Sequence, residues 1–131
     1  MAFDASWMMR WTVVLADEFE KEFAALDPDI QDELLSRLKL LEQFGPNLGR
    51  PNADTLDDSS FPNMKELRFR LNGLWRFAFA FDTKRQAVVL AGGNKEGENQ
   101  GRFYRELIKK ADERFGNYLK RLVQSKRSRQ P

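Results

Sequence analysis

The segment from Met64 to Asp82, MKELRFRLNGLWRFAFAFD, constrains the fold more than any other part of the chain. Apolar and charged residues alternate up to Asn72-Gly73, and aromatic residues alternate with small or charged ones beyond it. Such alternation is typical of strands with one buried face, and Asn-Gly is a frequent hairpin turn. The segment therefore predicts a β-hairpin.

The register of this hairpin can be predicted by sorting its side chains by polarity. A two-residue loop at Asn72-Gly73 would mix charged and aromatic side chains on both faces. A three-residue loop, Asn72–Leu74, pairs Arg70 with Arg76 and separates the two kinds. We therefore predict the longer loop, with Gly73 at a positive φ angle. Seven apolar side chains then share one face, and the opposite face carries Glu66, Arg68, Arg70 and Arg76 beside Ala78 and Ala80.

Apolar patterns outside the hairpin predict further strands and helices. The β-branched run Trp11–Ala16 predicts a buried strand, and Ala87–Ala91 predicts a third meander strand that Gly92-Gly93 ends. Apolar spacings of three and four residues predict three helices. These cover Glu18–Leu26, a segment from Pro28 after its cap Asp27 to Gly45, and Arg102–Leu122. The first two helices form an antiparallel hairpin with an acidic outer face, and residues 45–63 form a long loop.

Composition removes several classes of chemistry. The 131 residues, enough for about one domain, contain neither Cys nor His. This excludes thiol nucleophiles, disulfides, zinc sites built from Cys or His, and an imidazole base. Residues 1–64 carry 5 basic and 13 acidic side chains, whereas residues 65–131 carry 17 and 7. A basic half of this kind indicates an acidic partner, most often nucleic acid, and a solvated basic helix is the alternative.

The sequence predicts neither a membrane segment nor a signal peptide. No run approaches the roughly 18 consecutive apolar residues that span a bilayer. Met1–Arg10 lacks the basic start and apolar core of a signal peptide. We therefore expect a cytoplasmic protein.

Three arginines on one sheet face, Arg68, Arg70 and Arg76, repel one another unless a negative group lies among them. Arginine offers a fork of donors that matches phosphate and stays charged at any working pH. These side chains either bind an anion or pair with Glu66 and the acidic helical hairpin, and the small alanines beside them favour the anion. Tyr104, at the start of the last helix, is either a packing residue or an acid or base that reaches this face.

Four segments resemble a known family. They are NMKELRFR, LWRFAFAFD and VVLAGGNKEGENQGRFYRELIKKADERF, preceded by FGPNLGRPNADTL. Together they resemble the RelE/ParE toxin superfamily, specifically the HigB-like toxins of type II toxin–antitoxin systems, from about Val13 to Leu122. The resemblance implies an α+β fold: a small, twisted, mainly antiparallel RelE-like sheet, an N-terminal helical hairpin packed on one face and a C-terminal helix. The other face would be the active groove. We expect one toxin domain at 1–122 and a basic, flexible tail at 123–131.

The resemblance implies an endoribonuclease that cuts mRNA on the ribosome and so inhibits translation, without a metal or other cofactor. A co-encoded helix-turn-helix antitoxin of the HigA or Xre type would silence it, and operator DNA would be reached only through that antitoxin. One alternative is a ParE-like inhibitor of DNA gyrase, in which the arginines serve protein or DNA contacts. Another is a non-catalytic nucleic-acid-binding protein that uses the basic tail. Converging arginines beside a tyrosine favour the ribonuclease.

The resemblance also implies roles for individual residues. Arg76 corresponds to the arginine that stabilises the scissile phosphate, and Arg68 and Lys65 correspond to basic residues of the preceding strand. Lys95 corresponds to the basic residue after the last strand, and Tyr104 to the tyrosine that enters the terminal segment. Further substrate-binding residues are expected at Glu66, Arg70 and Arg102.

An RNA substrate carries its own nucleophile, the 2′-hydroxyl. The enzyme then supplies a base, cations that stabilise the phosphorane, and an acid for the leaving oxygen. Without His, the base is left open among Lys65, Glu66, Lys95 and Tyr104. We expect the arginines to lower the pKa of Glu66 and weaken it as a base. A lysine among arginines is expected to have a lowered pKa that suits a base near neutrality.

Overall fold

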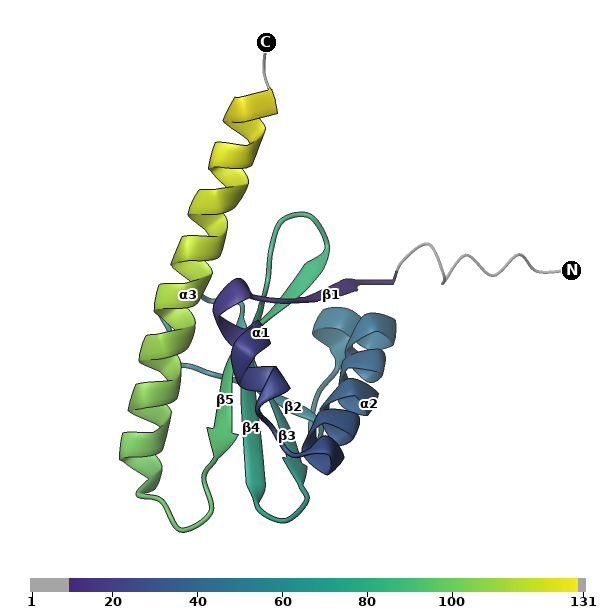
Figure 1. Cartoon of the computed structure of the whole chain (residues 1–131), viewed down its shortest axis with the longest axis vertical. Coiled ribbons are helices and arrows are strands. Elements are labelled where there is room, and N and C mark those ends of the chain that lie inside the picture. Colours follow the sequence, from purple (N-terminus) through teal and green to yellow (C-terminus); the bar gives the residue numbers. More distant parts are fainter. Residues whose placement is uncertain (1–9, 130–131) are drawn as a thin grey trace, which may run out of the picture.

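The computed structural model describes residues 10–129, with side chains placed up to residue 125 (Figure 1). Most of the segment inspected for a signal peptide and the last two residues of the expected tail lie outside this range. The elements are β1 (Thr12–Leu15), α1 (Asp17–Ala24), α2 (Pro28–Phe44), the 3-10 turn η2 (Gly45–Asn47), β2 (Ala53–Thr55), β3 (Met64–Arg70), β4 (Leu74–Phe81), β5 (Gln86–Asn94) and α3 (Gln100–Arg129).

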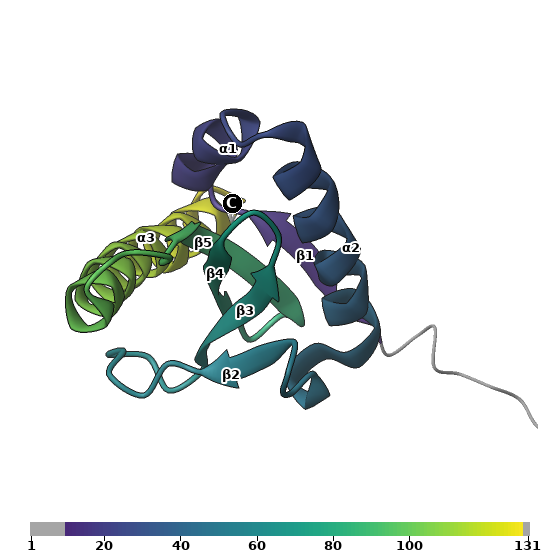
Figure 2. The ribbon, with the colours of Figure 1, turned by 90° about the horizontal axis from the view of Figure 1, so that it is seen from below.

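The five strands form one sheet in the order β1-β5-β4-β3-β2. β1 runs parallel to β5, and the other neighbours are antiparallel. In Figure 1, α1 and α2 lie on one side of the sheet and α3 on the other, and Figure 2 shows the same three layers from below. The predicted α+β fold is confirmed.

The hairpin has a three-residue loop, but the register differs from the prediction. Arg70 pairs with Leu74, so the loop is Leu71–Gly73 and begins one residue earlier than expected. The side-chain carbonyl of Asn94 accepts a 2.9 Å hydrogen bond from the Leu74 backbone, which fixes that residue in the strand. Because both registers pair even-numbered residues with even-numbered ones, the predicted faces are kept. Gly73 has the expected positive φ, 141°.

The apolar face of the hairpin packs against the helical pair. The rings of Phe19 on α1 and Phe77 on β4 meet edge to face, with centroids 6.0 Å apart. α2 contributes a stripe at intervals of three to four residues, and this stripe is buried: Ile30, Leu34, Leu38 and Leu41. The expected packing of the helical hairpin on one face is therefore confirmed.

The polar face is covered in part by α3. Ala78 and Ala80 of β4 have no exposed surface, and α3 contacts both β4 and β5. The alanines therefore leave no open space for an anion, contrary to the interpretation from the sequence, because their small side chains let a helix approach the sheet. α3 also continues to Arg129, so residues 123–129 are helical.

Two segments depart from the predicted boundaries. β5 runs through Gly92-Gly93 to Asn94 instead of ending at the glycines. A Cβ on Gly92 would collide with the ring of Phe77, so a glycine is needed for this close approach. The long loop contains η2 and β2, and its 56–63 part reaches α3 (Figure 2). No helix in the described part of the chain is long and apolar enough to cross a membrane.

Candidate active site

A buried carboxylate forms the centre of the candidate site. Glu66 of β3 is 4% exposed, and its Oε1 accepts a 2.9 Å hydrogen bond from the hydroxyl of Tyr104 on α3. Arg76 Nε, on β4, donates to the same hydroxyl at 3.3 Å and lies 3.4 Å from Glu66 Oε1. Arg68 Nε lies 3.4 Å from that oxygen as well. One carboxylate oxygen therefore faces a phenol and two guanidinium groups.

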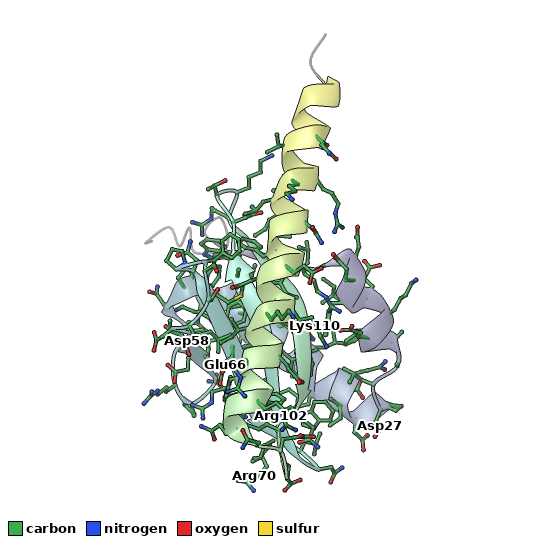
Figure 3. All side chains as sticks on the ribbon, turned by 90° about the vertical axis from the view of Figure 1, so that its left-hand side faces the viewer. Asp27, Asp58, Glu66, Arg70, Arg102 and Lys110 are labelled. Carbon is green, nitrogen blue, oxygen red and sulfur yellow. The ribbon has the colours of Figure 1, made fainter. Side chains whose placement is uncertain are left out.

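Strand geometry explains why these groups meet. Glu66 and Arg68 lie two residues apart on β3 and so share the polar face, and Arg76 pairs with Arg68 across the hairpin. Tyr104 lies in the second turn of α3, the helix that packs over this face. The sheet supplies the charges and the helix supplies the phenol. In Figure 3, Glu66 lies beside α3, and Arg70 and Arg102 lie near its lower end.

Burial dominates the electrostatics of the cluster. Burial raises the pKa of Glu66 above its ordinary value, although the hydrogen bond from Tyr104 and the charge of Arg76 oppose the shift. The arginines lower the pKa of Glu66 as predicted, but burial outweighs them, so the predicted net direction is wrong. Burial also raises the pKa of Tyr104, and the negative charge of Glu66 adds to the rise. The phenol stays protonated and the carboxylate becomes a stronger base.

Lys95 completes the cluster from the loop after β5. Its Nζ lies 5.8 Å from the ring centroid of Tyr104 and donates to Gln100 Oε1 at 3.3 Å. Burial lowers the pKa of Lys95, and the positive charges of Arg76 and Arg68 lower it further. The expectation that a lysine among arginines has a lowered pKa is confirmed for this residue.

Two hollows open around the cluster. The main groove, about 1140 Å³, runs between β2 and the 56–63 loop on one side and α3 on the other. Its lining includes the acidic residues Asp54, Asp57 and Asp58 on the first wall, the basic residues Lys95, Arg105 and Lys109 on the second, and Glu66, Arg68 and Tyr104 between them. The smaller arginine hollow is lined by Arg37, Pro51, Arg68, Phe69, Arg70, Leu74 and Arg76. Arg68 lines both.

Three of the predicted site residues do not join the cluster. Lys65 points to the opposite face of the sheet, where its Nζ donates to the carbonyl of Pro46 at 3.1 Å and lies 6.0 Å from the centroid of Phe81. Its odd position in β3 dictates this, because alternate side chains leave opposite faces. Arg102 is exposed on α3 and lines neither hollow. Arg70 lies in the arginine hollow, away from Glu66.

The sequence interpretation missed several lining residues. Arg105 and Lys109 follow Tyr104 and Ile108 by one position each, so a helical projection of α3 would have found them. Arg50 and Asp54 form an ion pair at 2.9 Å in the segment that folds back along β3. This Pro- and Gly-rich segment has no alternation of apolar and polar residues that would predict its pairing with β3. Among residues 10–129, no three acidic side chains are grouped as a metal site.

Comparison with known proteins places the chain in a family. Residues 21–116 match the family described as phage derived protein Gp49-like, DUF891. A Mycobacterium tuberculosis protein named as toxin HigB3 is 45% identical over 107 residues, which cover 82% of this chain and 92% of that protein. A second protein of that organism, named as toxin HigB2, is 42% identical over 106 residues. This match covers 79% of the chain and 52% of HigB2, so the chain spans about half of that relative.

Solved structures agree on the fold. The free state of an Escherichia coli RelE toxin mutant superposes with a TM-score of 0.57 at 14% identity, over 76% of this chain and 95% of that chain. The RelBE2 toxin–antitoxin complex of M. tuberculosis gives 0.50 at 15% identity, over 65% of this chain and 98% of that chain. Identities this low carry the fold only, and the family follows from the sequence matches. The chain belongs to the Gp49-like family, is related to the HigB toxins, and has a RelE-like fold.

Proposed function

We propose that this protein is the toxin of a type II toxin–antitoxin system and acts as an mRNA endoribonuclease. The observation that carries the proposal is the buried Glu66–Tyr104 pair between two arginines at the floor of the main groove. A carboxylate with a raised pKa, a fixed phenol and adjacent guanidinium groups are what 2′-hydroxyl attack on a phosphate requires.

The first half of the reaction uses Glu66 as the base. Tyr104 accepts the proton of the substrate 2′-hydroxyl and passes its own proton to Glu66, along the 2.9 Å hydrogen bond between them. The freed 2′-oxygen attacks the adjacent phosphorus. The raised pKa of Glu66 suits this step because the strength of a general base rises with its pKa.

The second half uses the cations. Arg68, which lines both hollows, and Arg76 stabilise the additional negative charge of the phosphorane. Lys95, whose pKa is lowered, gives a proton to the departing 5′-oxygen as the phosphorus–oxygen bond breaks. The products are a 2′,3′-cyclic phosphate and a 5′-hydroxyl end. Proton exchange with water then returns Glu66 and Lys95 to their starting states.

The partners are part of the same proposal. The RelBE2 structure, which shares this fold, is a toxin–antitoxin complex, and this supports an antitoxin as the protein partner of this chain. We propose a helix-turn-helix antitoxin of the HigA or Xre type, mRNA on the ribosome as substrate, and contact with operator DNA only through the antitoxin. Because the proposed substrate is mRNA, we propose that the protein acts in the cytoplasm.

The decisive experiment induces the chain in cells and maps the 5′ ends of cellular mRNA. Defined cuts within translated frames are expected for the wild type and should be lost in Glu66→Gln and in Arg76→Ala. Removal of the arginine should cost about a hundredfold in rate. Lys39→Ala, at an exposed position of α2 outside both hollows, is the control and should cut normally. Intact mRNA together with double-strand breaks in DNA would instead identify a gyrase inhibitor.

A synthetic substrate tests the chemistry itself. RNA with a single deoxyribose at the mapped cut position lacks the nucleophile and should stay intact, while neighbouring bonds keep their sensitivity. Cleavage at the deoxyribose would eliminate the 2′-hydroxyl mechanism. Where cutting needs ribosomes, the same substrate is presented as a short programmed message.

A further inference from the structure

We infer that the arginine hollow is a second phosphate-binding subsite, which holds the nucleotide next to the bond that is cut. This inference rests on the proposed function, because it deepens the description of the same RNA substrate. It assigns the strand a path that leaves the main groove at Arg68 and continues past Arg70 toward α2.

The charge of the hollow supports an anionic occupant. Four guanidinium groups and no carboxylate line it, whereas the main groove includes four acidic residues. Arg70 is exposed and has no ion pair or hydrogen bond within the described residues. Arg68 directs its buried Nε toward Glu66 Oε1, 3.4 Å away, but its side chain is 32% exposed and lines the hollow. Arg70 therefore offers donors that no described residue occupies.

The far wall of the hollow is held in place before any ligand arrives. Arg37 of α2 donates to Asn52 Oδ1 at 2.6 Å and to Glu33 Oε1 at 2.9 Å, and its guanidinium lies 5.8 Å from the ring centroid of Phe69. The backbone carbonyl of Asn52 accepts from the Arg68 N–H at 2.8 Å. Asn52 thus holds both Arg37 of α2 and the backbone of β3 at Arg68, so little conformational entropy is lost when a ligand binds.

The spacing of the arginines suits consecutive phosphates. Arg68 and Arg70 lie on one face of β3, two residues apart, which is about 6.6 Å along a strand. This separation is comparable with that of neighbouring phosphates in an extended RNA strand. Pro51 and Leu74 add an apolar surface between the arginines, against which a ribose or base can pack. A peptide of acidic residues alone would fill the charged positions of the hollow but would leave its apolar surface without a partner.

The test measures binding, so that it does not depend on cleavage. Fully 2′-O-methylated RNA with a fluorescein label is titrated with the full chain over a series of salt concentrations. The wild type is compared with Arg70→Ala, Arg37→Ala and Lys39→Ala. Lys39 is exposed on the same helix as Arg37 and lines neither hollow, so it serves as the matched control. Thermal melting verifies that each variant is folded.

For a hexanucleotide we expect Arg70→Ala to weaken binding about tenfold and to reduce the slope of log affinity against log salt by about 0.7, the value for one phosphate contact on a single strand. Arg37→Ala should act in the same direction, and Lys39→Ala should match the wild type. A dinucleotide, which has a single phosphate, should bind the wild type and Arg70→Ala equally.

Three results would overturn the subsite. The first is equal affinity of the wild type and Arg70→Ala for the hexanucleotide while mRNA is still cut in cells. This result would reject the subsite and leave the proposed function intact. The second is a wild type that binds no RNA. The third is a hexaglutamate peptide that binds as tightly as RNA and depends on Arg70, which would assign the hollow to an acidic protein segment. Binding that depends on Arg70 in a protein that cuts no mRNA would keep the subsite and reject the ribonuclease.

Discussion

At the scale of single residues, Glu66 links stability to pH. Burial raises its pKa above the ordinary value of 4.5 in the folded protein. Between 4.5 and the folded-state value, the folded protein holds a proton that the unfolded chain releases. The contribution of Glu66 to the free energy of unfolding is therefore fully present below this pH window, and it is lost as the pH rises through the window.

Glu66→Gln removes this titration and keeps the shape of the side chain. We expect its free energy of unfolding to increase relative to the wild type as pH is raised from about 4 to about 7, because the variant does not carry the cost of a buried charge. Urea denaturation over this range measures the difference. Glu113→Gln, on the exposed side of α3, should give a difference that does not vary with pH, and the same flat result for Glu66→Gln would contradict the assignment.

Tyr104→Phe removes the hydroxyl that passes the proton to Glu66 and keeps the packing of the ring. The hydrogen bond from Tyr104 lowers the pKa of Glu66, so its removal should raise that pKa further. The acid limb of the pH profile for RNA cleavage should then move to higher pH, with a loss of about a hundredfold in kcat/KM. Kinetics on a labelled RNA across pH provide the measurement. An unchanged acid limb would show that Glu66 is not the base.

Part of the site could be predicted from individual residues, and part could not. Strand alternation correctly grouped Glu66 with Arg68 and Arg76. The same alternation puts Lys65 on the opposite face of the sheet, so it argues against Lys65 as a site residue. The pKa of Glu66 was predicted in the wrong direction because the sequence shows the nearby charges without the depth of burial. Burial depends on α3, a helix that begins 34 residues later.

At the scale of elements, Asp112 of α3 fastens the 56–63 loop to the helix. The side chain accepts from Ser59 Oγ at 2.5 Å and from the Ser60 N–H at 2.9 Å. The rings of Phe61 and Phe115 meet edge to face beside this contact, with centroids 4.9 Å apart. These contacts hold the loop against α3.

Asp112→Ala should release the loop without disturbing the sheet. Loss of two hydrogen bonds at a partly buried site should lower the free energy of unfolding by about 1–2 kcal/mol. Hydrogen exchange of residues 56–63 should become faster, whereas β4 should keep its protection. Glu113→Ala, one position along the same helix, should change neither quantity. Normal protection of the loop in Asp112→Ala would show that the contact is not structural.

Elements with periodic patterns were predicted, and those held by non-local contacts were not. α2 begins at Pro28, as its cap and apolar spacing indicate. β2 is three residues long and pairs with β3 only through the fold of the preceding loop. A strand this short carries too few alternating positions to be distinguished from a loop.

At the scale of the whole molecule, the end of α3 extends beyond the sheet (Figure 1). The last buried apolar residue on this helix within the described side chains is Phe115, and Arg121 binds Asp17 and Glu18 of α1. Residues 123–125 are exposed and do not line the main groove. The sequence places Lys126, Arg127 and Arg129 after them, and we expect this positive charge to attract a polyanion.

Deletion of residues 123–131 tests this division. We expect the free energy of unfolding to change by less than about 1 kcal/mol, because the described side chains at the start of the deleted segment, residues 123–125, are exposed. Binding to RNA should become less dependent on salt, and cleavage at the mapped positions should persist. Urea denaturation, titration and 5′-end mapping measure the three quantities. If the truncated protein is folded but binds no RNA, the result would favour a non-catalytic protein that binds nucleic acid through its basic tail.

The parallel pairing of β1 with β5 has a consequence for the order of folding. β3, β4 and β5 are joined by short turns, whereas Thr12 must find Gln86 after α1, α2 and three strands have intervened. Closing so long a loop costs more chain entropy than closing a hairpin, so the meander forms early and β1 joins late. The first strand in the chain is thus among the last to be placed, and contacts in β1 govern how fast the protein unfolds rather than how fast it folds.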